Sequence, residues 1–112
     1  MEVRAWFNGQ STYGIRVGIP NRDRYFDCKW TLIEVEIDGH FHEFALTPGF
    51  WKKCPEFRDS GGTVLRDWLQ KLDKYCWTAC HPPRFQLQPL DGTRFRLSPV
   101  SDGGIGACGC CG

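Results

Sequence analysis

The segment RFQLQPLDGTRFRL, residues 84–97, alternates apolar and polar side chains on both sides of an Asp-Gly pair. This alternation is typical of two strands that share one apolar face, and Asp-Gly between them predicts a β-hairpin. We expect a three-residue loop at residues 90–92 with Gly92 in the left-handed conformation, because this register sets apolar side chains opposite each other. The expected pairs are Leu87–Phe95 and Phe85–Leu97. The other face then carries Gln86, Gln88, Arg94 and Arg96.

The segment IEVEIDGHFHEFAL, residues 33–46, has the same pattern around Asp38 and Gly39 and predicts another hairpin. A two-residue turn at these positions would place Glu34 opposite Glu43, and like charges in that position are unfavourable. A three-residue loop avoids this contact. It pairs Val35 with Phe41, Glu34 with His42, and Glu36 with His40. By analogy with the hairpin of residues 84–97, we expect the three-residue loop.

Upstream, residues 2–7 and 13–20 are predicted strands, the second ended by Pro20, and residues 21–28 are a predicted polar connection. One helix is predicted between the hairpins, because apolar residues recur there at helical spacing. Its apolar stripe consists of Leu65, Trp68, Leu69, Leu72 and Tyr75. Ser60 or Thr63 is the expected N-cap, and Asp67 and Lys71 the expected i,i+4 ion pair.

These elements give the order β-β-β-β-α-β-β. We therefore expect an α+β fold, in which a curved antiparallel sheet or partial barrel of about six strands packs against one helix. Residues 1–100 are expected to form a single domain. Residues 101–112, rich in glycine and cysteine, are expected to be a flexible tail, because they contain a single aliphatic side chain larger than alanine.

Composition and charge indicate the cellular compartment of the protein more clearly than its function. The 14 basic and 13 acidic side chains leave a net charge of +1, so bulk charge favours no class of partner. No apolar run has the length of a signal peptide or a membrane helix, which predicts a soluble, cytoplasmic protein with no membrane partner. In that compartment the cysteines at positions 28, 54, 76 and 80 would be unpaired thiols.

The main candidate site is the connection TPGFWKKCPEFRD, residues 47–59, because connections on a rigid sheet often carry specificity. Phe50 and Trp51 are the expected apolar anchors, with Lys52, Lys53 and Arg58 as the charged rim. The protein would then be a binding or interaction domain for a small ligand, a peptide or a second copy in a homodimer. At least two of Phe50, Trp51 and Phe57 should be buried. We predict no cofactor and no catalytic residue at this site.

Two alternatives stay open. Arg84, Arg94 and Arg96, with the neighbouring glutamines, offer the chemistry of a nucleic-acid-binding face. His40 and His42 lie two apart on one predicted strand and would share a face with Glu34 and Glu36, which is a possible ligand set for a metal-dependent enzyme. The simpler interpretation of these four residues is a solvated sheet face with ordinary cross-strand pairs.

Overall fold

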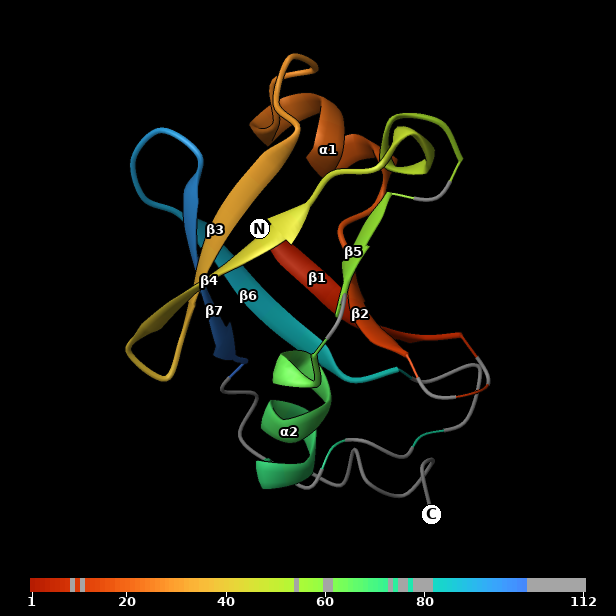
Figure 1. The fold of residues 1–112 in the computed structure, drawn as a ribbon, viewed down its shortest axis with the longest axis vertical. Helices are drawn as coiled ribbons and strands as arrows, with labels where there is room; N and C mark the ends of the chain where they lie inside the picture. Colours follow the sequence, from red (N-terminus) through yellow and green to blue (C-terminus); the bar gives the residue numbers. More distant parts are fainter. Residues whose placement is uncertain are drawn as a thin grey trace.

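The computed structural model describes residues 1–8, 10, 12–53, 55–59, 62–72, 74, 77 and 82–100 (Figure 1). Its helices and strands follow in chain order. They are β1 (Glu2–Phe7), β2 (Tyr13–Arg16), α1 (Ile19–Tyr25), β3 (Leu32–Ile37), β4 (His40–Ala45), the 3-10 turn η1 (Pro48–Trp51), β5 (Glu56–Arg58), α2 (Val64–Lys71), β6 (Arg84–Pro89) and β7 (Arg94–Pro99). The predicted tail, residues 101–112, lies outside the described residues.

The described strands form one curved sheet in the order β4-β3-β7-β6-β1-β2-β5. Its two edges approach each other, since the rings of Phe44 in β4 and Phe57 in β5 lie 5.0 Å apart between centroids. The sheet is therefore a nearly closed barrel, and the predicted α+β partial barrel is confirmed. The prediction was incomplete in three respects: within the described residues the sheet has seven strands, the β3–β7 pair is parallel, and there are two α-helices.

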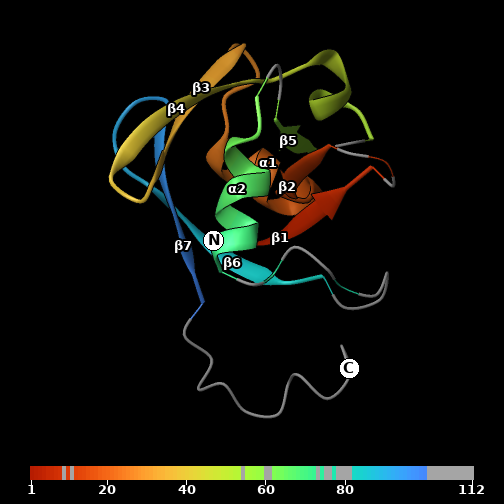
Figure 2. The ribbon, with the colours of Figure 1, turned by 60° about the horizontal axis from the view of Figure 1, so that its bottom comes forward.

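The barrel interior is filled by the apolar residues of the alternating strands, and each end is closed by a different group of side chains. Helix α2 lies at one end of the barrel, at the bottom in Figure 1 and in front of the strands in Figure 2, and Leu65, Trp68 and Leu69 of this helix are buried. At the end near α1, Phe26 stacks on Phe95 with ring centroids 4.8 Å apart and also contacts Phe50. Aromatic side chains account for much of this core because each buries a large apolar area.

The predicted register of the β3–β4 hairpin was wrong. Asp38 and Gly39 have φ values of 53° and 85°, as a two-residue type I′ turn requires. Glu34 therefore lies opposite Glu43, and Val35 opposite His42. The expected repulsion is offset by β7, which lies on the other side of β3 and places arginines beside Glu34 and Glu36. The register could not be predicted from residues 33–46 alone, because β7 comes from a distant part of the sequence.

The β6–β7 register was also wrong, by two residues. Leu87 lies opposite Leu97, and Pro89 lies opposite Phe95. The loop has three residues, as predicted, but they are residues 91–93, closed by a 2.9 Å hydrogen bond from the Leu90 amide to the Arg94 carbonyl. Gly92 has a φ of 55° and is left-handed, as predicted. A shift of two keeps every side chain on its predicted face, so alternation favours both registers equally.

Helix α1 occupies part of the segment that we predicted to be a strand and a polar connection. Pro20 lies in its first turn, where a missing amide hydrogen costs nothing. The helix shows no apolar stripe because the side chain that it buries is Arg22. The Arg22 guanidinium donates hydrogen bonds of 3.0 Å and 2.9 Å to the carbonyls of Phe50 and Lys52. Arg22 thus joins α1 to η1.

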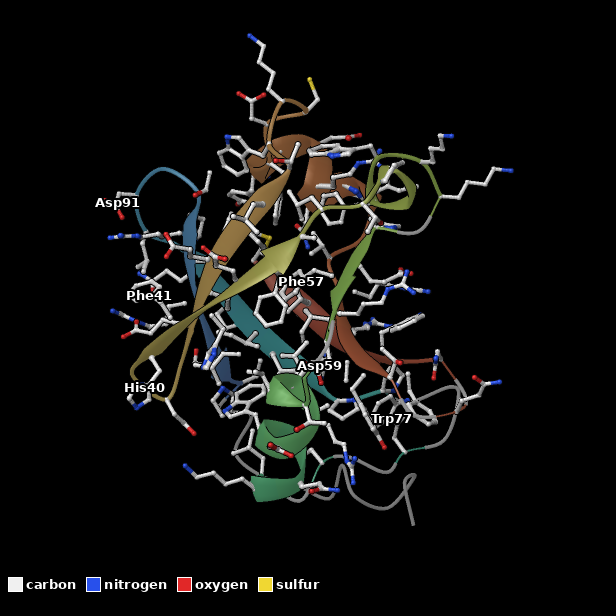
Figure 3. The ribbon with its side chains drawn as sticks, viewed as in Figure 1. His40, Phe41, Phe57, Asp59, Trp77 and Asp91 are labelled. Atoms are coloured by element: carbon white, nitrogen blue, oxygen red, sulfur yellow. The ribbon has the colours of Figure 1, made fainter. Side chains whose placement is uncertain are left out.

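Thr63 is the N-cap residue of α2, as predicted, but its side chain makes no capping hydrogen bond. The capping carboxylate belongs to Asp59, which lies at the beginning of the helix in Figure 3. Its carboxylate accepts hydrogen bonds of 2.8 Å and 3.1 Å from the amides of Leu65 and Arg66. Thr63 instead donates to Asp67. The predicted ion pair between Asp67 and Lys71 does not form. Lys71 pairs with Asp38 instead. Ser60 and Tyr75 lie outside the described residues.

Within the described ranges, neither helix is long and apolar enough to cross a membrane. Cys28 is exposed and unpaired. The cysteines at positions 54, 76 and 80 lie outside those ranges.

Candidate anion-binding face

The connection of residues 47–59 does not form one continuous site. Phe50 is 0% exposed, so it belongs to the core and cannot contact a partner. Trp51 is half-buried and packs edge-on against Phe50 at 5.0 Å, whereas Lys52 and Lys53 are exposed. Phe57 is also buried, so the prediction that two of the three aromatics are buried is confirmed. That Trp51 and the two lysines bind a ligand stays a prediction.

The predicted metal ligands are not brought together. Because of the two-residue turn, His40 and His42 share a face with the buried residues of β3, and Glu34 and Glu36 point to the other side. His40 lies at the tip of the hairpin (Figure 3). Among the residues that the structure describes, no group of three or more His, Cys, Asp or Glu side chains is arranged to hold a metal ion.

Arg94 and Arg96, two of the predicted nucleic-acid contacts, are already paired within the protein. Arg94 Nε lies 3.2 Å from Glu34 Oε1, and Arg96 Nε lies 2.6 Å from Glu36 Oε1. Both contacts are hydrogen bonds. Arg94 also lies over the ring of Phe41, with 5.2 Å between the guanidinium carbon and the ring centroid. A ligand on this face would have to compete with these contacts.

Arg84, the third predicted contact, belongs to a different group. Its strand, β6, pairs with β1, and Arg84 lies directly opposite Arg4. On its other side Arg4 faces Arg16 of β2. Arg16 in turn faces Glu56 of β5. Three arginines therefore lie in one row across three neighbouring strands on the outer surface; we call Arg84, Arg4 and Arg16 the arginine row.

The carboxylates near the arginine row are too few and too distant to satisfy it. Glu2 lies 3.4 Å from Arg84, and Glu56 lies 3.5 Å from Arg16, both longer than an ordinary hydrogen bond. In the described part of the chain, Arg4 has no ion-pair partner. Neighbouring like charges repel each other, so this row lowers the free energy of unfolding unless a further negative charge lies near it.

A second row lies beside the first on the same face. Trp6 of β1 and Arg58 of β5 both lie opposite Gly14 of β2. The Arg58 guanidinium covers the Trp6 ring, with 4.8 Å between its central carbon and the ring centroid. Arg58 also lies 3.7 Å from Glu56, which is the only buried carboxylate of the described residues. The face thus combines four arginines, one tryptophan and two glutamates.

We did not predict from the sequence that Arg4, Arg16 and Trp6 belong to a candidate site. Their strands show the required signal, because alternation places Arg4 and Trp6 on the polar side of β1 and Arg16 on the polar side of β2. What sequence does not show is that β6 lies beside β1. This pairing brings Arg84 from the far end of the chain into the row.

Comparison with models of protein families, with curated proteins and with solved structures found no match to this chain.

Proposed function

We propose that this protein is a nucleic-acid-binding domain and that the arginine row holds the phosphate backbone. One observation carries the proposal. Arg4 lies between Arg84 and Arg16, and Arg4 itself has no ion-pair partner among the described residues. A row of guanidinium groups that is only partly neutralised by Glu2 and Glu56 is complementary to a chain of phosphates, since each group offers a planar fork of donors to phosphate oxygens.

The length of the row suits a regularly charged polymer. Neighbouring strands lie about 4.8 Å apart, so the row spans about 10 Å between backbones. Arginine side chains are long enough to contact consecutive phosphates of one strand at that span. Each such contact releases a counterion and contributes to affinity. The net charge of +1 adds little long-range attraction, so the affinity depends on these contacts and falls as the salt concentration rises.

Fluorescence anisotropy with a labelled oligonucleotide of about 12 nucleotides tests this proposal, a length within the site sizes of small domains. We expect Arg4→Ala and Arg16→Ala each to weaken binding about fivefold, because an exposed ionic contact is worth up to about 1 kcal/mol. Each change should also reduce the slope of log affinity against log salt by about 1.

Arg94→Ala and Arg96→Ala are the matched controls. They remove the same charge from side chains of similar exposure, at 50% and 51%, but these arginines are hydrogen-bonded to Glu34 and Glu36. We expect much smaller losses from them. Equal losses from all four variants would contradict an arginine row at Arg84, Arg4 and Arg16. Absence of salt-dependent binding by the native protein would contradict nucleic-acid binding altogether.

A cytoplasmic location suits this function, and the predicted homodimer is compatible with it. Light scattering at several protein concentrations measures the oligomeric state directly.

A further inference from the structure

Trp6 and Arg58 meet across an intervening strand, and Gly14 makes this possible. Their strands flank β2, so the two backbones lie about 10 Å apart. The guanidinium nevertheless reaches within 4.8 Å of the ring centroid. A Cβ atom at Gly14 would lie 3.0 Å from Trp6 Cε3, 3.0 Å from Arg58 Cβ and 2.6 Å from the Phe57 carbonyl oxygen. The glycine therefore leaves the space over which the two side chains close; we call Trp6 and Arg58 the stacking pair.

Glu56 links the stacking pair to the arginine row. Its side chain is 2% exposed and lies between Arg16 at 3.5 Å and Arg58 at 3.7 Å. Its Oε2 atom accepts no hydrogen bond within the described residues. A buried carboxylate attracts both guanidinium groups from below without engaging their donors at hydrogen-bond distance. Arg16 and Arg58 are thereby held beside Glu56 while their side chains stay 53% and 42% exposed to solvent.

The two rows have the spacing of a phosphate and its own base. Arg4 and Trp6 are two residues apart on β1, as are Glu56 and Arg58 on β5, so the rows lie about 6.7 Å apart on one face. Aromatic rings and guanidinium planes both stack on nucleobases. In a duplex, the faces of the bases are covered by their neighbours, and only an unpaired base offers a free face.

We infer that the protein binds single-stranded nucleic acid and that one unpaired base stacks on Trp6 and Arg58 while the adjoining phosphates lie on the arginine row. This inference rests on the proposed function and specifies its ligand. Arg58 supplies the exposed planar surface, and Trp6 supports that surface from the side of β1.

The test compares a mixed-sequence strand of about 12 nucleotides with the duplex that it forms with its complement, at one salt concentration. We expect the native protein to bind the single strand at least tenfold more tightly. Arg58→Lys, which keeps the charge but removes the planar group, should weaken single-strand binding about fivefold or more. It should weaken duplex binding much less, because the positive charge is retained. Arg96→Lys is the control, because it makes the same substitution at an arginine paired with Glu36.

Trp6→Leu provides a second variant, and it should lose part of the tryptophan fluorescence quenching that the single strand causes. If it fails to fold, the exposed Arg58→Lys variant still decides the question. Equal affinity for strand and duplex, or no effect of Arg58→Lys, would overturn the inference. Weaker binding by Arg4→Ala in the same experiment would still support the proposed function. No binding to either probe would overturn both.

Discussion

At the scale of single residues, distance rather than residue type separates the arginines. Arg96 lies 2.6 Å from its glutamate, whereas Arg16 lies 3.5 Å from Glu56 and Arg4 has no ion-pair partner in the described part. Arg96 therefore has its charge paired at hydrogen-bond distance, whereas Arg16 and Arg4 are not hydrogen-bonded to a carboxylate in the described part. Sequence composition counts all of them equally.

Asp59 is the residue with the clearest structural role outside the candidate site. Its carboxylate accepts two backbone hydrogen bonds at the beginning of α2. We expect Asp59→Ala to lower the free energy of unfolding by about 1–2 kcal/mol, as loss of an N-terminal cap does. Asp59→Asn should cost less, because its amide oxygen still accepts one of the bonds. Urea unfolding measures both, and equal losses from Ala and Asn would contradict the capping role.

Asp59 also predicts a dependence of stability on pH. Burial raises the pKa of this carboxyl, with a smaller raising effect from Asp67, and these outweigh the two backbone hydrogen bonds and His42, which lower it. The folded protein therefore keeps the proton to a higher pH than the unfolded chain, whose value is near 3.9. The stability that the folded protein gains from holding this proton is fully present below about pH 4. It is lost as the pH rises through the raised pKa.

Comparison with Asp59→Asn isolates this effect, since the variant lacks the titrating group. We expect the unfolding free energy of the native protein, relative to Asp59→Asn, to be larger near pH 3.5 than at pH 7. Urea unfolding at both pH values gives the two differences. A difference that grows with pH would show that the pKa of Asp59 is lowered instead.

At the scale of elements, α1 and η1 depend on one buried side chain. Arg22 is 9% exposed and hydrogen-bonds the carbonyls of Phe50 and Lys52, while its Nε lies 3.1 Å from Asp23. Alternation and helical periodicity did not predict this contact, because both patterns identify elements through apolar residues. A helix that buries an arginine is polar in sequence and resembles a loop.

Arg22→Met tests this connection. The variant leaves the buried Phe50 carbonyl and the partly buried Lys52 carbonyl without their donor, and we expect the free energy of unfolding to fall by about 2–3 kcal/mol. Arg24→Met, an exposed position of the same helix, is the control and should change stability by less than about 0.5 kcal/mol. Similar losses from the two variants would show that the hydrogen bonds to η1 are not the cause.

At the scale of the whole molecule, the barrel is completed by side chains where its backbone does not close. The sheet ends at β4 and β5, and the rings of Phe44 and Phe57 bridge these edges. Figure 3 labels Phe57. Phe57 is 1% exposed and Phe44 is 4% exposed, so water does not reach this contact. The closure therefore depends on apolar packing.

Phe44→Ala should lower the free energy of unfolding by about 3–5 kcal/mol, because it removes buried apolar area and leaves a cavity at the closure. Phe41→Ala is the control on the same strand, since Phe41 faces outward and is 43% exposed. We expect it to cost about 1 kcal/mol or less, mainly through its contact with Arg94. Chemical denaturation measures both, and equal costs would exclude a special role for the Phe44–Phe57 contact.

The sequence by itself determined which residues face inward and which outward on the strands of residues 84–97, and it located α2. These properties follow from periodicity, which is local. It also predicted the burial of aromatic residues in the connection of residues 47–59, since large apolar side chains gain most from leaving water.

Only the tertiary structure decided which strands are neighbours. The pairing of β1 with β6 created the arginine row, and the parallel pairing of β3 with β7 committed Arg94 and Arg96 to glutamates. The physical reason is that a side chain's direction is fixed by its own strand. Its partners depend on segments that are brought together by packing of the whole barrel.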